Sequence, residues 1–399
     1  MNVVKAILQY NAGRDPERLA LKYAKMRADP FVFLRGTCHL FYARLPTRGI
    51  FKSAPPVWCC GDLHLENFGS YKGDNRIAYF DINDFDEAVL APATWDLVRL
   101  LASLRVGAAS LGLQPMAAEE LCTAFLSGYA RALAGGKAYW VEPQTAQGLV
   151  HTLLDGLRDR KRAAFLDSRT LRKGPKRRLR VDGRKALPVS DAQRATVTAF
   201  MQAFAQTQHN PRFYEVLDVA RRIAGTGSLG VDRYSILVEG KGSPDGNYLL
   251  DLKQALPSSL ETHLKTAQPR WASHAERVVA AQRRIQAVSM AFLQPVALQG
   301  QPYVLRGLQP LEDRVSLDGA RQRLSDIRAV IASMGQMVAW GQLRSAGRQG
   351  SAIADELIAY AQRGKWQVKL QAAAADMAMQ TLRDAAEYNA AFDDGAFRL

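Results

Sequence analysis

Apolar side chains recur at helical spacing along most of this chain. The pattern predicts helices over residues 15–48, with a break at Asp29-Pro30, and over 94–111, 116–133, 145–165 and 191–207. From about residue 325 to the end the chain is Ala-rich and again helical in pattern. Helices therefore make up the larger part of the expected fold.

Segments with strand character are fewer and fall in two main regions. Near the N-terminus, residues 57–60 form a short apolar run, and 68–71 with 76–80 predict a hairpin. The region from 219 to 308 is β-like, and its pattern predicts strands at 234–238, 248–252 and 303–306 and one helix at about 272–292. Between these regions, Asp182-Gly183 predicts the turn of another hairpin within residues 177–187.

Length and cysteine usage narrow the class of protein. At 399 residues the chain is long enough for two or three packed cores. It has no run of about 18 apolar residues and no apolar core of a signal peptide at its start, so we expect no membrane association. The cysteines show no metal-ligand spacing and are expected to be reduced and mostly buried, which favours a cytoplasmic protein. They are Cys38, Cys59, Cys60 and Cys122.

The net charge of +15 is concentrated in one segment. Residues 158–185 contain thirteen Lys or Arg and three acidic residues, which accounts for two thirds of that charge. The segment is either a solvated charged face or a surface for an anionic substrate. Nucleic acid is the less favoured partner, because aromatic side chains for base stacking are missing apart from Phe165.

Two short stretches near the N-terminus carry residues suited to phosphoryl transfer. Residues 60–69 include Asp62 and, five positions later, Asn67, and residues 80–86 include Asp84. Phosphoryl transfer from ATP needs a carboxylate to orient the acceptor hydroxyl, and an amide and a carboxylate to hold Mg²⁺. The plainer alternative is an acidic loop of turn-forming residues, but a preceding apolar strand and a following hairpin favour the site.

A second stretch, much later in the chain, has the pattern of a phosphate-binding loop. Gly225, Gly227, Ser228 and Gly230 belong to a G-x-G-x-x-G sequence that precedes a strand, not a helix. This order argues against a Rossmann dinucleotide site and for a β-turn-β flap over phosphates. Lys253 ends a later strand of apolar character, so its ammonium needs an anionic partner.

These motifs carry a resemblance to known families. Residues 61–67 resemble the catalytic loop of aminoglycoside phosphotransferases and choline-kinase-like enzymes, within the protein-kinase-like superfamily. Residues 84–88, followed by Asp96-Leu97, resemble the metal-binding segment of that superfamily and the helix behind it. In finer detail the chain resembles the bacterial family called domain of unknown function 2252, in four stretches: 30–36, 61–69, 225–230 and 252–255.

The resemblance implies roles for individual residues. Asp62 would be the catalytic base, and His64 would brace its loop or share in proton transfer. Asn67 and Asp84 would hold Mg²⁺, with Asp86 as a further ligand. Asp81 and Asp86 rival Asp84 as the main carboxylate. Asp96 would brace the catalytic loop. The glycine-rich loop and Lys253 would hold ATP, with Glu261 or Glu276 beside the lysine and Gln309-Pro310 as the hinge.

The order of the motifs departs from the superfamily, because the catalytic loop precedes the glycine-rich loop. A circular permutation explains this order, with helix 333–342 in the place of the helix that leads into the catalytic loop. We therefore expect an α+β, protein-kinase-like bilobal fold, circularly permuted, with additional helices. Its expected divisions are a catalytic core (1–135), a helical segment with a basic hairpin (136–215), a β-rich nucleotide-binding region (216–310) and C-terminal helices that complete the large lobe (311–399).

The expected function is Mg²⁺-ATP-dependent transfer of a phosphoryl group to a hydroxyl of a small-molecule or anionic substrate. Two alternatives stay open at this point. One is transfer of AMP to a protein, and the other is a non-catalytic nucleotide sensor or nucleic-acid-binding protein built around residues 158–185.

Overall fold

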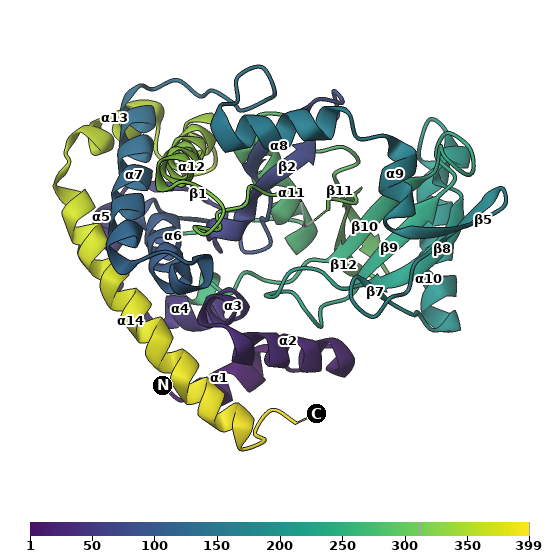
Figure 1. Ribbon diagram of the computed structural model, residues 1–399, viewed down its shortest axis with the longest axis horizontal. Helices are drawn as coiled ribbons and strands as arrows, with labels where there is room; N and C mark the ends of the chain where they lie inside the picture. Colours follow the sequence, from purple (N-terminus) through teal and green to yellow (C-terminus); the bar gives the residue numbers. More distant parts are fainter. Residues whose placement is uncertain (311–312, 399) are drawn as a thin grey trace.

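The computed structural model describes residues 1–310 and 313–398, and Figure 1 shows helices gathered at one end and a sheet at the other. The helices are α1 (Val3–Tyr10), α2 (Pro16–Ala28), α3 (Pro30–Gly36), α4 (Cys38–Arg44), α5 (Ile50–Ser53), α6 (Thr94–Gly107), α7 (Pro115–Ala134), α8 (Gly148–Arg158), α9 (Arg162–Asp167), α10 (Asp191–Gln206), α11 (His274–Ile285), α12 (Leu324–Arg344), α13 (Ala354–Gln362) and α14 (Lys365–Asp393). The strands are β1 (Pro56–Cys59), β2 (Phe68–Lys72), β3 (Ala78–Ile82), β4 (Val89–Pro92), β5 (Thr170–Lys173), β6 (Lys176–Leu179), β7 (Ala186–Leu187), β8 (Val216–Arg222), β9 (Arg233–Val238), β10 (Tyr248–Gln254), β11 (Gln294–Leu298) and β12 (Gln301–Gly307). The mixed α+β class expected from the sequence is confirmed.

The break at Asp29-Pro30 divides the first helical region as the sequence predicts. The Asp29 side chain accepts hydrogen bonds from the backbone N–H groups of Phe31 and Val32, and Pro30 occupies the first turn of α3. Proline fits there because the first-turn N–H groups have no partner inside the helix. The cap thus starts α3, which ends beside the loop that contains Asp62.

Strands β8, β9 and β10 form an antiparallel meander at the centre of a six-stranded sheet, in the order β11-β12-β10-β9-β8-β7. The glycine-rich segment 225–230 connects β8 to β9, and Lys253 lies near the end of β10. Helix α10 packs against one face of the sheet through Val197 and Met201. Leu179 of β6 belongs to the apolar cluster on the other face. The meander thus brings Lys253 beside the glycine-rich segment.

Two short strand pairs place the N-terminal motifs side by side. In the pair β1–β4, Cys59 lies opposite Val89, and in the pair β2–β3, Phe68 lies opposite Ile82. The segment 60–67 leaves β1 and enters β2, while 83–88 leaves β3 and enters β4. Because these strands are paired at those positions, the two connecting segments must emerge next to each other.

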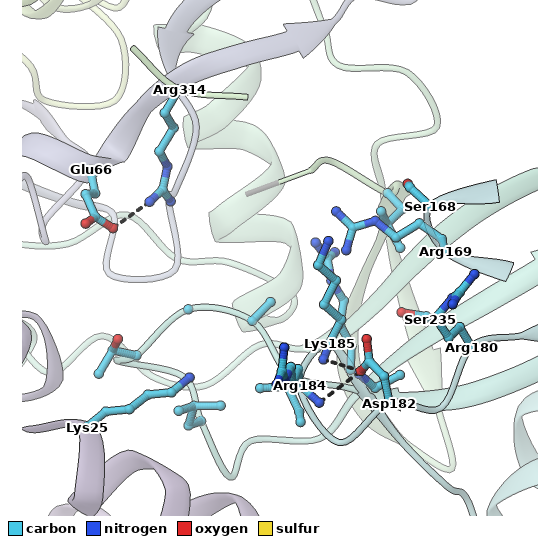
Figure 2. Close-up of a pocket in the computed structure, with 18 of the residues that line it drawn as sticks. Lys25, Glu66, Ser168, Arg169, Arg180, Asp182, Arg184, Lys185, Ser235 and Arg314 are labelled. Carbon is cyan, nitrogen blue, oxygen red and sulfur yellow. Dashed lines mark hydrogen bonds and ion pairs between the residues drawn. The ribbon is translucent and has the colours of Figure 1, made fainter. Parts of the chain in front are cut away.

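Two details of the sequence analysis are wrong. The region 145–165 is two helices, α8 and α9, with a break between them, instead of one. The turn of the basic hairpin is Gly174-Pro175, between β5 and β6, and not Asp182-Gly183. Asp182 instead accepts backbone N–H groups of Arg184 and Lys185 and closes a local loop ahead of β7, as Figure 2 shows. Asp-Gly favours a tight turn without specifying that strands follow on both sides.

Other expectations about the class of protein agree with the structure. All four cysteines are free and buried. Among the helices of the described residues, none combines the length and the apolar character needed to cross a membrane. The long C-terminal helices α12 and α14 occupy the region in which the sequence is Ala-rich.

Helices α7 and α12 approach each other through glycine. A Cβ added at Gly335 would lie 2.2 Å from the backbone oxygen of Phe125, and one at Gly128 would lie 2.2 Å from that of Ala332. Backbone atoms cannot move aside as a flexible side chain can, so these contacts require glycine in both helices. Helix α12 also packs against β1, which leads into the Asp62 loop.

We expect Gly335→Ala to destabilise the protein by about 1–3 kcal/mol, because the added methyl group overpacks the α7–α12 contact. Gly156→Ala is the matched control: Gly156 lies inside α8, and a Cβ there would meet nothing within 4 Å. Alanine at that position should stabilise by about 0.5–1 kcal/mol. Urea unfolding of the two variants measures both values, and equal stabilities would contradict the close approach of α7 and α12.

Candidate functional site

The N-terminal motifs and the glycine-rich segment with Lys253, far apart in sequence, line one cleft of about 550 Å³. The helical side contributes Asp62, His64, Asn67, Asp84 and Asp86, and the sheet side contributes Gly225, Gly227, Ser228 and Lys253. Gly230 lies outside the lining: its backbone oxygen accepts the N–H of Asp15, and a Cβ added there would lie 2.9 Å from the Cβ of Arg14. The cleft thus places Lys253 and most of the glycine-rich loop across from the N-terminal carboxylates.

Asp96, in the first turn of α6, fixes the loop that carries Asp62 through hydrogen bonds to its backbone. Its two carboxylate oxygens accept the backbone N–H groups of Cys60 at 2.8 Å and Gly61 at 3.0 Å. Burial raises the pKa of Asp96 to about 6. Gly61 has a φ of +90°, and a Cβ there would lie 2.1 Å from the backbone oxygen of Glu87, so only glycine fits. Asp96 thus occupies the bracing position that the sequence predicts.

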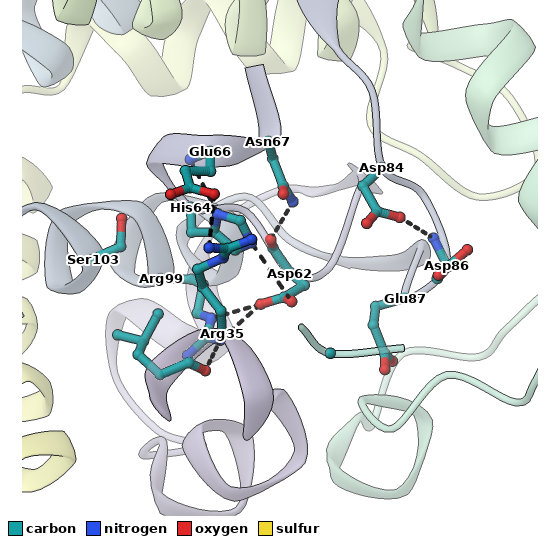
Figure 3. A network of polar contacts seen from close by, with 12 residues as sticks. Arg35, Asp62, His64, Glu66, Asn67, Asp84, Asp86, Glu87, Arg99 and Ser103 are labelled. Carbon is teal, nitrogen blue, oxygen red and sulfur yellow. Dashed lines mark hydrogen bonds and ion pairs between the residues drawn. The ribbon is translucent and has the colours of Figure 1, made fainter. Parts of the chain in front are cut away.

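Asp62 projects into the cleft with one oxygen held and the other less engaged. Its Oδ1 accepts from Nε and Nη2 of Arg99 at 3.0 and 2.7 Å, as Figure 3 shows. Its Oδ2 lies 4.0 Å from Nε2 of His64. A Cβ at Gly227 would come within 3.9 Å of Oδ2, so the glycine-rich loop lies over this oxygen. Asn67 donates from Nδ2 to the backbone oxygen of Asp62, which fixes the spacing of these two side chains.

His64 is better placed to brace the loop than to move a proton. It is buried, and its Nδ1 accepts the backbone N–H of Glu66 at 3.1 Å. Burial, and then the charges of Arg35 and Arg99, lower the pKa of His64 well below its ordinary value. The ring is therefore neutral, with its proton on Nε2 toward Asp62.

Lys253 meets the N-terminal carboxylates through Asp86. Its Nζ forms an ion pair with the Asp86 carboxylate, although the two residues lie 167 positions apart. Burial raises the pKa of Asp84, and the charge of Asp86 adds to this effect. Burial acts in the same direction on Asp86, but the charge and hydrogen bond of Lys253 outweigh it, and its pKa is lowered. Asp86 is thus neutralised by lysine, while Asp84 makes no ion pair within the described residues.

The remaining carboxylate of this segment is directed elsewhere. Asp81 is buried outside the cleft lining and forms an ion pair with Arg344 of α12 at 3.2 Å. Its Oδ1 accepts its neighbour's backbone N–H, from Ile82. This geometry favours Asp84 over Asp81 as a carboxylate that faces a ligand.

The expected glutamate partner of Lys253 is wrong. Glu276 accepts the backbone N–H of Ala272 at the start of α11, and Glu261 lies 3.9 Å from Nε of Arg277. Helix α11 instead reaches the site through Arg277, which donates to the backbone oxygens of Asp86 and Ala88. The sequence could not reveal this exchange, because a helix position reaches its partner only through the tertiary packing.

Asp251, two positions before Lys253 on the same strand face, has its own partners. It forms ion pairs with Arg222, Arg233 and Arg306. The three guanidinium groups hold its pKa well below the ordinary value although burial opposes them. The cleft-facing side of the sheet is therefore charged beside Lys253, with more positive than negative groups. Gln309 and Pro310 of the expected hinge line the same cleft, and residues 311 and 312 lie outside the described residues.

Sequence reasoning missed three groups at the site. Arg99 lies one helical turn after Asp96, and its signal was a cation within the otherwise apolar pattern of α6. Glu87 follows Asp86 directly and accepts hydrogen bonds from Ser258 and Ser259. Arg14 and Lys22 both donate to the backbone oxygen of Gly227, and nothing in the local sequence signals this contact.

The donor set fits a magnesium ion. Asp84 and the free oxygen of the Asn67 amide are hard oxygen ligands, and Asp86 lies beside them. Mg²⁺ is usually held in proteins by one or two carboxylates together with substrate phosphates and water. Among the described residues, no group of three or more His, Cys, Asp or Glu side chains could hold a metal ion without other donors. The site would therefore depend on Asn67 and on oxygens of a bound ligand.

One comparison with known proteins gives a match. A family model described as "Uncharacterized protein conserved in bacteria (DUF2252)" matches residues 14–391. No curated protein and no solved structure matches this chain. The matched range includes every residue that lines the cleft except Met1 and those of α1.

We expect Asp96→Asn to lower the free energy of unfolding by about 1–3 kcal/mol, because the amide cannot accept from both backbone N–H groups. Asp155→Asn, on the exposed side of α8, is the control and should change stability by less than about 0.5 kcal/mol. Urea unfolding near neutral pH checks both variants. Wild-type stability in Asp96→Asn would show that the loop does not depend on this carboxylate.

Proposed function

We propose that this chain, which belongs to the bacterial DUF2252 family, transfers a phosphoryl group from Mg²⁺-bound ATP to a hydroxyl of a small molecule. The observation that carries the proposal is the convergence of the two motifs on one cleft. Lys253 and the glycine-rich loop lie across from Asp62, Asn67 and Asp84, although about 140 or more residues separate the two sets. Neither set alone is sufficient for phosphoryl transfer.

The residues present divide the work of such a reaction. Asp62 is oriented by Arg99 and offers Oδ2 to the hydroxyl of an acceptor in the cleft. The glycine-rich loop presents backbone N–H groups, and Lys253 presents its ammonium, to phosphate oxygens. Asn67 and Asp84 would hold Mg²⁺, which supplies charge neutralisation on the phosphates. Catalysis on this proposal rests on positioning and charge stabilisation.

The order of elements around the sheet supports a kinase-like, circularly permuted architecture. In protein kinases a glycine-rich loop covers the phosphates and the lysine lies on the third strand of the sheet. Here the glycine-rich loop joins β8 to β9, Lys253 lies on the next strand, β10, and helix α11 follows. The Asp62 loop precedes all of them in sequence, as a permutation requires. Helix α12 packs against α7 and β1, beside the start of that loop.

One observation also favours AMP transfer as a second candidate. The cleft side of the sheet next to Gln309 holds Arg222 and Arg306, paired with the buried Asp251, in place of an apolar surface for a base. These arginines suit phosphate groups, and a nucleotide bound in the reverse direction would direct its α-phosphate toward the acceptor. The mass of the modified product separates the two reactions, since one adds a phosphoryl and the other an adenylyl group.

We expect Mg²⁺ with ATP to raise the melting temperature, by binding the native state. Binding at a hundredfold excess over Kd stabilises by about 2.7 kcal/mol. Asp84→Ala should remove the metal-dependent part of this effect. Since the pKa of Asp84 is raised by burial and by Asp86, protons compete with the metal, and the stabilisation should weaken as the pH falls. Differential scanning fluorimetry measures these effects, and a melting temperature indifferent to Mg²⁺-ATP would count against nucleotide binding.

We expect Asp62→Asn to keep the fold and the binding of Mg²⁺-ATP while turnover falls by about 10²–10⁴-fold. The amide nearly matches the carboxylate in size, so packing is preserved, but it cannot accept a proton. Asp155→Asn should leave turnover unchanged, since Asp155 is exposed on α8 away from the cleft. ATP consumption in the presence of a hydroxyl acceptor measures the rate. Full activity in Asp62→Asn would assign the catalytic role to another carboxylate.

A further inference from the structure

One wall of the cleft has no part in the division of work described above. It is formed by the end of α1, by α4 and by the residues that follow β10. We call it the α1–α4 wall, and its residues are Tyr10, Cys38, His39, Ser258, Ser259 and His263. The proposed function assigns the nucleotide and Mg²⁺ to other parts of the lining, so this wall is available to the acceptor.

His39 contributes to this wall a ring that the protein fixes in place but does not hydrogen-bond. The ring stacks on that of Tyr10, with centroids 3.9 Å apart and planes 13° from parallel. Both Nδ1 and Nε2 of His39 are buried, and neither has a hydrogen-bond partner among the described residues. A buried polar atom without a partner costs free energy, and folded proteins leave few of them. A molecule in the cleft can supply the partner, because His39 belongs to the cleft lining.

Hydrogen bonds connect the stacked pair to the carboxylates of the cleft. Tyr10 donates from its hydroxyl to Oε1 of Glu87 at 3.1 Å. The other oxygen of Glu87 accepts from the Ser258 hydroxyl and from the backbone N–H and hydroxyl of Ser259. Burial raises the pKa of Glu87, and the charge of Asp62 adds to this effect, so the two carboxylates lie near each other, as Figure 3 shows. The α1–α4 wall is thus joined to the region of Asp62.

His39 is neutral in this position. Burial lowers its pKa well below the ordinary value, and the charges of three cations act in the same direction, namely Lys22, Arg14 and Arg99. A neutral imidazole has one N–H that donates and one nitrogen that accepts. A hydroxyl can pair with either nitrogen, since it both donates and accepts. An ammonium can pair only with the accepting nitrogen, and a carboxylate only with the N–H.

The charges around the α1–α4 wall favour an uncharged ligand. An ammonium beside the imidazole would be repelled by Lys22 and Arg14, which already donate to the backbone of the glycine-rich loop. An anion would meet the carboxylates of Asp62 and Glu87. These carboxylates act on the wall itself, because their charges add to burial in raising the pKa of the Cys38 thiol. A neutral ligand avoids both repulsions.

We propose that the α1–α4 wall is the acceptor subsite and that the acceptor is an uncharged polyol, one of whose hydroxyls hydrogen-bonds His39. At least two hydroxyls are needed, because a second one reacts at Asp62. In that step the reacting oxygen takes the γ-phosphoryl group of ATP, its proton passes to Asp62, and ADP leaves. The role as acceptor rests on the proposed function, whereas the binding of a polyol at His39 does not.

Matched ligands test the binding and its charge class. Sorbitol, gluconate and glucamine differ only in whether one end is neutral, anionic or cationic, and so do glycerol, glycerate and 3-aminopropane-1,2-diol. Saturation-transfer NMR measures their affinities for the full chain, in EDTA and without nucleotide. We expect saturable binding of at least one neutral ligand and weaker binding of its two charged counterparts. Binding of neither neutral ligand, or tighter binding of a charged one, would overturn the inference.

The variant His39→Phe tests the residue itself, since it keeps a ring that can stack on Tyr10 and removes both nitrogens. Because those nitrogens have no partner among the described residues, the melting temperature should not fall. The affinity for the neutral ligand should fall about three- to tenfold, as for the loss of one neutral hydrogen bond. His151→Phe, at an exposed position of α8 outside the cleft lining, is the matched control and should keep the affinity within about twofold. Equal affinities in the two variants would overturn the role of His39.

Further arms separate this inference from the proposed function. His39→Phe should keep the thermal stabilisation by Mg²⁺-ATP, whereas Asp84→Ala should lose its metal-dependent part and still bind the neutral ligand. If the wild type binds the neutral ligand and Mg²⁺-ATP does not stabilise it, the proposed function fails and the polyol site stands. Where the neutral ligand supports ATP turnover, His39→Phe should raise its KM about three- to tenfold with kcat unchanged. A lower kcat with an unchanged KM would contradict a binding role.

Discussion

The ion pair between Lys253 and Asp86 is the contact on which the candidate site depends. It joins the end of β10 to the segment 83–88 and so closes the cleft between the sheet and the helical part. Lys253 is buried, whereas the Asp86 side chain is 36% exposed, so removing Asp86 would leave a buried ammonium without its partner. A ligand that brings phosphate to Lys253 must therefore supply a new partner for the ammonium and leave Asp86 to a metal ion.

Carboxylates and cations are unevenly distributed across the cleft. The carboxylates of Asp62, Asp84 and Asp86 line its helical side together with Arg14 and Arg35, while the sheet contributes Lys253, Arg222, Arg233 and Arg306. This separation explains why the pKa values of Asp84 and Asp86 move in opposite directions, although burial raises both. Asp86 meets the lysine and Asp84 does not. Carboxylates on one side of a cleft suit a metal ion, and cations on the other side suit phosphate groups.

The N-terminal helices help to set the position of the glycine-rich loop. Arg14 and Lys22 donate to the backbone oxygen of Gly227, and Asp15 donates its N–H to Gly230. Arg18 donates to the backbone oxygen of Val231 just beyond the loop. These contacts from α2 and from the residues just before it hold the loop over Asp62. Gly225 and Thr226 of the loop line both this cleft and a second cavity beside it.

The sequence by itself determined the local elements and most of the residues at the site. The break at Asp29-Pro30 depends on residues adjacent in sequence, and so the local pattern predicts it, whereas the brace at Asp96 was indicated only by the family resemblance. Only the tertiary structure decided which charged groups meet. The pairing of Lys253 with Asp86 in place of a glutamate follows from how the sheet packs on the helical part. Local spacing constrains a backbone over a few residues, whereas an ion pair across 167 residues depends on the packing of the whole core between them.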